Sequence, residues 1–147
     1  MGLIQKIISF AETPASFKWT FIKAWFLSAF VKLTLVFLPF SRVLKWKGQP
    51  GKETPSMPDP PTEEYRRRLQ SAMRLVALYT PWKSECYTQA LTAKIILQQR
   101  GLPATIYIGF RKNSSGAYEG HAWLRSYDRI VTGNQEIDTY QVHTFYS

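Results

Sequence analysis

Residues 84–91 read SECYTQAL and open an apolar helical pattern that continues to Leu97. Ser84 is a favourable N-cap residue, and Gly101 stands where a glycine commonly ends a helix, so the pattern predicts a helix between them. Cys86 is the only cysteine of the chain and falls in the first turn of this helix. Unpaired N–H groups and the helix dipole favour an anion at that place, which predicts a lowered thiol pKa and a nucleophilic thiolate.

A histidine downstream can act with such a thiol. The segment GHAWL, residues 120–124, reads as the start of a strand and contains His121. His121 is a better candidate for a general base than His143, which lies close to the C-terminus. A thiol at a helix start with an imidazole on a later strand is the arrangement needed for nucleophilic catalysis. The alternative is that Cys86 is an ordinary buried thiol and His121 an ordinary strand residue.

A third residue would orient the imidazole through its other nitrogen. Asp128, Asn134 and Asp138 follow His121 closely enough to do so. Asn134 is slightly favoured because it follows the next strand, and Asp128, in the turn after the histidine strand, is the second catalytic candidate. All three are also common turn residues.

Three further residues are candidates for substrate contact. The oxyanion would need the Cys86 N–H and one other donor, and Gln89 lies one helical turn from Cys86. Trp82 and Trp123 flank the two reactive residues and are candidates to line a substrate groove. Packing roles are open for all three.

The remaining core sequence predicts an α+β domain whose helices are segregated from an antiparallel sheet. Apolar residues at three- to four-residue steps predict a helix capped by Thr62 and ended before Pro81. Alternating and β-branched segments predict strands at 103–111, 118–126, 129–132 and 141–145, joined by short turns.

The N-terminal third has a different composition. It predicts a short helix at 3–11 and a long apolar helix at 16–38, followed by a proline-rich linker. The predicted organisation is therefore an N-terminal helical region (1–46), a linker (47–61) and the core (62–147). Lysines interrupt the long helix on different faces, which favours a helix packed on the domain, with contact to a membrane as the alternative.

Charge and cysteine content limit the function. The net charge is +9, and residues 1–52 hold eight basic residues against one acid, Glu12. This basic region favours an anionic membrane surface, an acidic partner or an acidic peptide, and no nucleic-acid-binding signature accompanies it. The single cysteine allows no internal disulfide, which fits a reducing compartment and predicts a cytoplasmic protein. Two histidines with scattered carboxylates favour no metal site.

The motifs together resemble a known family. The segments PWKSEC (81–86), QAL (89–91), RGLPA (100–104), Gly109, GHAWL (120–124) and VTG (131–133) are similar in order and spacing to the lasso peptide biosynthesis B2 proteins, which are transglutaminase-like leader peptidases. The resemblance is close over about residues 62–147. The N-terminal segment ending LPFSR (38–42) is also similar.

The resemblance implies a transglutaminase/papain-like core and a cysteine protease that removes the leader from a ribosomally made lasso precursor peptide. It implies Cys86 as the nucleophile and His121 as the base and acid, with no cofactor. The family's third member is acidic, whereas the matching region here reads VTGN (131–134). The expected partners are the precursor, a separate leader-recognition B1 protein and a macrolactam cyclase. The competing interpretation is a non-catalytic binding module with a basic helical N-terminus for a peptide or membrane partner.

Overall fold

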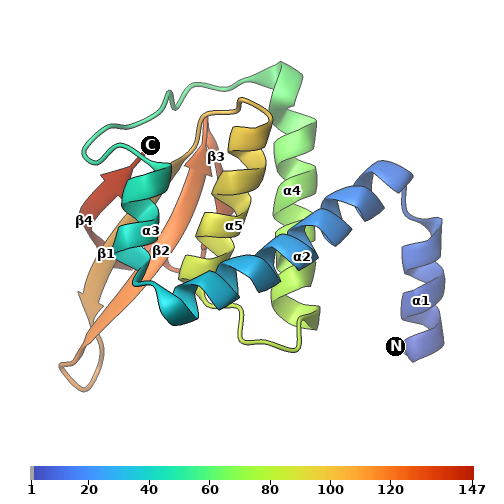
Figure 1. The fold of residues 1–147 in the computed structure, drawn as a ribbon, viewed down its shortest axis with the longest axis horizontal. Helices are drawn as coiled ribbons and strands as arrows, with labels where there is room; N and C mark the ends of the chain where they lie inside the picture. The colour runs from blue at the N-terminus through green and yellow to red at the C-terminus, as the bar shows by residue number, and fades with distance from the viewer. Residues whose placement is uncertain (1) are drawn as a thin grey trace.

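Five helices and four strands form the fold of the computed structural model, which describes residues 2–147 (Figure 1). The helices are α1 (Leu3–Glu12), α2 (Ala15–Phe37), α3 (Phe40–Lys47), α4 (Pro60–Tyr79) and α5 (Cys86–Gln99). The strands are β1 (Thr105–Lys112), β2 (Tyr118–Ser126), β3 (Arg129–Thr132) and β4 (Gln141–Tyr146), with a short 3₁₀ turn, η1 (Ile137–Thr139), before β4. The predicted α+β class is confirmed.

The strands form one antiparallel sheet in the order β3-β2-β1-β4. Side chains alternate between the two faces of a strand, so the register of β1 with β2 assigns each residue to a face. Ile108 pairs with Ala122, and both belong to the buried core beneath the helices. Gly109 pairs with His121, which therefore lies on the opposite face, with Trp123.

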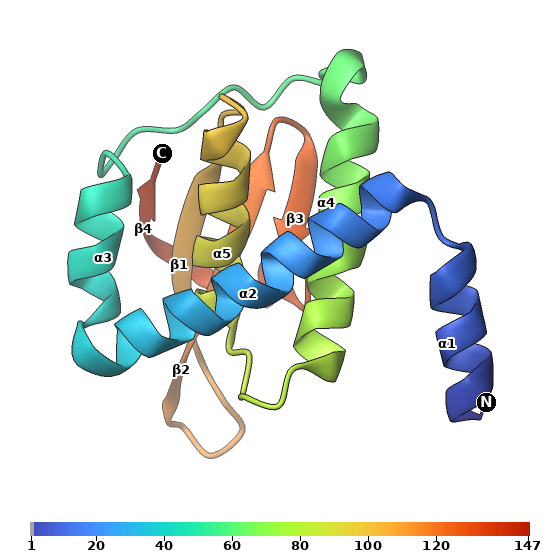
Figure 2. The same cartoon turned by 45° about the vertical axis from the view of Figure 1, so that its right-hand side comes forward.

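The helices lie in two layers over the inner face of the sheet. α5 packs on β2 and α4 packs on β3, and α2 crosses over both of these helices (Figures 1 and 2). Ala24 and Val31 of α2 are buried in the same apolar cluster as Leu69 of α4 and Leu91 of α5. Helix α2 and the core therefore share one hydrophobic interior.

The starts of two helices differ from the predictions. α4 begins at Pro60 after Asp59, because proline is well accommodated in a first helical turn. Thr62 is thus inside the helix, where its hydroxyl bonds the Asp59 side chain. α5 begins at Cys86 after Glu85, and the buried hydroxyl of Ser84 has no partner among the described residues.

The segment between α3 and α4 is irregular, as its prolines predict, and is fixed to the sheet. Gln49 and Ser147 exchange backbone hydrogen bonds of 2.9 and 3.1 Å, beside a bridge from Pro50 to Tyr146. Further along, Arg125 donates to the carbonyl oxygens of Thr54 and Pro55 at 3.0 Å. The short helix α3 was not predicted from sequence.

The long helix α2 is apolar on two sides. Its buried side packs on the protein, as predicted, through residues such as Ala24 and Ser28. The opposite side is exposed, and Phe26 and Phe37 are 66% and 77% accessible. Within residues 2–147, α2 is the one helix that is long and apolar enough, at 23 residues, to cross a membrane by length and composition.

Candidate active site

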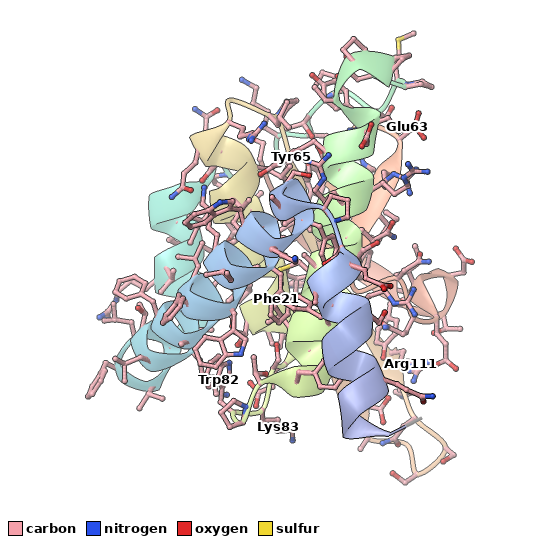
Figure 3. The ribbon with its side chains drawn as sticks, turned by 90° about the vertical axis from the view of Figure 1, so that its right-hand side faces the viewer. Phe21, Glu63, Tyr65, Trp82, Lys83 and Arg111 are labelled. Atoms are coloured by element: carbon pink, nitrogen blue, oxygen red, sulfur yellow. The ribbon has the colours of Figure 1, made fainter. Side chains whose placement is uncertain are left out.

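Cys86 is the first residue of α5 and is half-buried. The preceding loop, residues 80–85, is held against α2 by two contacts. Trp82 packs edge-to-face on Trp25 with ring centroids 4.8 Å apart, and Glu85 forms an ion pair of 3.4 Å with Lys32 (Figure 3, which labels Trp82). Helix α2 thus helps to fix the position at which the thiol emerges.

Two opposing effects act on the thiol. Burial disfavours the thiolate and raises the pKa of Cys86 above its usual 9.0, while backbone N–H groups of Ala122, Tyr87 and Cys86 itself act in the opposite direction. Burial is the larger effect. The lowering expected from the helix terminus is therefore outweighed, and the resting thiol is protonated at neutral pH.

His121 lies on β2, opposite Gly109 of β1. Its Nε2 atom is 2.8 Å from the carbonyl oxygen of Gly133. Because a carbonyl oxygen only accepts hydrogen bonds, Nε2 must carry the hydrogen. In the neutral imidazole, Nδ1 is then the basic nitrogen. The ring is placed between Trp123 and Tyr140, with centroids 5.9 and 5.0 Å away.

The two reactive residues approach β2 from different sides. The thiol lies beside the backbone N–H of Ala122, the residue directly after His121. Ala122 faces the helices and His121 faces the outer side of the sheet. In the described part of the chain, no hydrogen bond joins the thiol to the imidazole. The structure thus places the thiol of α5 beside Ala122, the strand neighbour of His121, with no ion pair formed between the two reactive residues among those described.

The three candidates for the third residue lie elsewhere. Asp128 forms a 3.0 Å ion pair with the fully buried Arg66, which lowers the pKa of the Asp128 carboxyl. Asn134 is exposed and follows Gly133, and Asp138 is exposed in η1. The backbone carbonyl of Gly133 occupies the place at Nε2 that a side chain was expected to fill.

The candidates for substrate contact are placed as follows. Gln89 donates to the carbonyl oxygen of Ser84 at 2.9 Å, so its amide braces the loop before Cys86. It also lines an open cavity of ≈ 340 Å³ between α4, α5 and the end of β3, beside Gly133 and Asn134. Trp82 is packed against α2, and Trp123 is 5% exposed and stacked on Tyr107 at 5.6 Å.

Sequence reasoning did not identify Gly133, Tyr87 or Tyr140. Gly133 adopts φ +76°, and a Cβ at this position would lie 2.5 Å from the Ala122 carbonyl oxygen. The sequence signal for this close approach of two backbone segments was that Gly133 directly follows a predicted strand. The hydroxyl of Tyr87 would lie 2.7 Å from a Cβ built on Gly120. Burial and the neighbouring Cys86 and Tyr140 raise the pKa of Tyr87.

A helix that begins at a cysteine and packs on an antiparallel sheet, with a histidine on the adjoining strand, defines a cysteine-protease-like fold. A family model described as Transglutaminase-like superfamily matches residues 34–144, and the chain belongs to this superfamily. The match begins near the end of α2 and reaches β4. No significant match was found among curated proteins or solved structures.

Proposed function

We propose that this chain is a cytoplasmic cysteine peptidase that removes the leader from a ribosomally made lasso precursor peptide. The observation that carries the proposal is the 2.8 Å contact between His121 Nε2 and the carbonyl oxygen of Gly133. His121 directly precedes Ala122, whose backbone N–H meets the Cys86 thiol. The contact at Nε2 fixes the tautomer in which Nδ1 can take a proton. Membership of the transglutaminase-like superfamily and the sequence resemblance described above give further support.

The proposed reaction has two halves. His121 Nδ1 takes the thiol proton as Sγ attacks the carbonyl carbon at the leader–core junction. The Cys86 N–H, which has no acceptor within the helix because it is the first residue of α5, stabilises the developing oxyanion. The C–N bond then breaks, the core amine leaves with the proton from Nδ1, and the leader remains as a thioester. Water, losing a proton to Nδ1, cleaves the thioester to a leader carboxylic acid and the free thiol.

The raised thiol pKa suits a mechanism in which the base acts only when substrate is bound. A protonated resting thiol resists oxidation and alkylation, and proton transfer follows when the peptide excludes water and draws the two groups together. The substrate class rests on the resemblance. The same resemblance supports two partners, a separate leader-recognition protein and a macrolactam cyclase, because the B2 proteins that this chain resembles work with such proteins.

The test is mass spectrometry of a candidate lasso precursor incubated with the chain and its recognition protein. We expect the wild type to cut at a single junction, and Cys86→Ala and His121→Gln to release no leader. Asn134→Ala is the matched control, because it alters the next side chain after the Gly133 carbonyl without touching the imidazole. Leader release by Cys86→Ala would exclude the thioester mechanism.

A second candidate function is a non-catalytic binding module. Two observations favour it: the raised pKa of Cys86 and the absence of a thiol–imidazole hydrogen bond in the described residues. In this case the wild type would bind the leader and its recognition protein without cutting. Binding with equal affinity by Cys86→Ala, and no product in either incubation, would establish it.

A further inference from the structure

The exposed side of α2 carries an unbroken line of large apolar residues. They recur at three- and four-residue steps and are 41–77% accessible; we call them the outer face of α2: Trp19, Ile22, Phe26, Phe30, Leu33 and Phe37. At 1.5 Å per residue the line is roughly 27 Å long. Taking ~200 Å² for a full aromatic side chain, its four rings alone expose roughly 600 Å². The largest apolar patch on a typical monomer is about 300–600 Å², so this surface is large before its aliphatic residues are counted.

Sequence spacing and packing explain why the outer face exists. Ala24, Ser28 and Val31 fix the opposite side of α2 on the protein, where all three are at most 4% accessible. Figure 2 shows α2 lying across α4 and α5 on the outside of the domain. Because the opposite side of α2 is fixed against these helices, the outer face points away from the domain. For α2 to cross a bilayer, its packing on α4 and α5 would have to break. In the packed position, α2 can instead lie along the surface of an apolar partner.

The charges around the outer face identify its partner. No acidic residue occurs between Thr13 and Lys52, a segment that contains seven Lys or Arg. Lys23 is exposed on α2 at the edge of the outer face, and Arg42 and Lys45 are exposed on α3, which follows directly. An apolar line edged with cations matches the surface of an anionic bilayer, where the rings enter the acyl boundary and the cations meet the headgroups.

A protein partner fits these features less well. Lysine is depleted from the buried centres of protein interfaces, yet Lys23 lies next to Phe26 and Phe30 on the helix surface. At a membrane the same lysine extends its ammonium to the headgroups while its methylenes stay with the rings. Trp19, near the start of the line, is a residue enriched at membrane interfaces.

We propose that the outer face of α2 is a peripheral membrane-binding surface that docks the domain on anionic lipid with α2 parallel to the bilayer plane. The surface is independent of Cys86 chemistry. Lys32 lies in the C-terminal half of α2 but outside the outer face, on the side that meets the protein, where it pairs with Glu85 directly before Cys86. The nucleophile loop is therefore tied to the protein-facing side of the docking helix.

The test is cosedimentation of the full chain with vesicles of phosphatidylcholine containing one part in three of phosphatidylglycerol, against vesicles of phosphatidylcholine alone. We expect binding to the anionic vesicles that weakens as salt is raised. The double variant Phe26→Ser/Phe30→Ser should lose roughly tenfold or more in affinity, and Lys23→Gln about fivefold. Circular dichroism should be unchanged, because all three side chains are exposed.

Met57→Ser is the matched control, since Met57 is an equally exposed apolar residue (76%) outside α2 and should bind as the wild type. Cys86→Ala should also bind normally, which separates this result from the proposed peptidase activity. Failure to sediment with anionic vesicles, or undiminished binding by the double variant, would overturn the proposal. Two other results would also overturn it. One is that the wild type is a dimer and the double variant a monomer. The other is that the outer face is needed to bind a leader-recognition protein while the chain binds no lipid.

Discussion

The imidazole Nε2 of His121 is held at 2.8 Å by the backbone carbonyl oxygen of Gly133. In a thiol site this position commonly belongs to a carboxylate or amide side chain. A carbonyl fixes the same tautomer, but it adds no negative charge to stabilise an imidazolium. The histidine is thus oriented by a neutral group rather than by a charged one. This agrees with a protonated resting thiol at Cys86, whose pKa burial raises.

Gly133→Ala should disable the site by moving this carbonyl. A methyl group there would meet the Ala122 carbonyl oxygen at 2.5 Å and the Cβ of Trp123 at 2.8 Å, at a φ of +76°. We expect a loss of about 3 kcal/mol or more in the free energy of unfolding, measured in urea, and no leader release. Gly116→Ala is the control, because φ is +82° but nothing lies within 4 Å, and it should cost only about 1 kcal/mol. Equal losses in the two variants would show that the close approach of Gly133 is unimportant.

Asn134→Ala should leave turnover within about threefold of the wild type, because the exposed amide lies outside the Nε2 hydrogen bond. Removing a side chain that orients a catalytic imidazole costs about 10⁴-fold where one is used. Steady-state cleavage rates distinguish these outcomes directly. A drop approaching that size would make Asn134 the orienting residue.

Asp128→Asn should affect stability in a pH-dependent way. The Arg66 guanidinium beside it lowers the pKa of the Asp128 carboxyl below its usual 3.8, so the ion pair stabilises the fold above that pH. The contribution is lost as the pH falls through the lowered pKa. The wild type should therefore unfold at higher urea than the variant at neutral pH, and the gap should narrow below about pH 4. A gap independent of pH would contradict this origin.

Local patterns predicted most of the fold. Alternation and turn residues predicted all four strands, and apolar spacing predicted α2, α4 and α5. The predicted helix starts were less accurate. Thr62 and Ser84 are favourable N-cap residues in isolation, but Asp59 and Glu85 hold the N-cap positions in the folded chain. α3 was missed because it has only eight residues and directly follows a proline, although Phe40, Val43 and Leu44 have the spacing of one helix face.

The site was only partly visible in the sequence. Cysteine and histidine have distinctive chemistry, so Cys86 and His121 could be selected as candidates. The Gly133 carbonyl could not, because every residue carries one and only the folded chain shows which carbonyl meets the imidazole. The direction of the thiol pKa was also misjudged. A helix terminus is a local feature, whereas burial, which outweighs it here, depends on tertiary packing.

Alkylation of the native chain should begin only at alkaline pH. Cys86 is the sole cysteine, so iodoacetamide incorporation reports on this thiol alone. A pKa above the usual 9.0 leaves less than about one thiol in a hundred ionised at pH 7. We expect the midpoint of the rate–pH profile to lie above pH 9, and the chain unfolded in urea to show a lower midpoint. A native rate already at its plateau at pH 7 would reveal a preformed thiolate–imidazolium pair instead.

Lys94→Met should stabilise the fold at neutral pH. Lys94 is 1% exposed on α5, where its ammonium donates to the Ala104 carbonyl oxygen at 3.0 Å and burial lowers the pKa of the side chain from 10.5 to about 8. This lowering of the pKa means that burial destabilises the charged side chain by roughly 3 kcal/mol. Replacing it removes that penalty but also loses the hydrogen bond, which costs about 1 kcal/mol. The variant should thus gain about 2 kcal/mol in the free energy of unfolding at pH 7.

The pH dependence separates this cause from better packing. A group whose pKa is lower in the folded chain binds fewer protons there, so the wild type becomes more stable as the pH rises from about 8 to 10.5. Methionine does not titrate. Other titrating groups are common to both chains, so the difference between their unfolding free energies isolates Lys94. The advantage of the variant should shrink steadily over this range in urea unfolding, and an advantage that persists unchanged at pH 10 would have to come from packing of the methionine side chain.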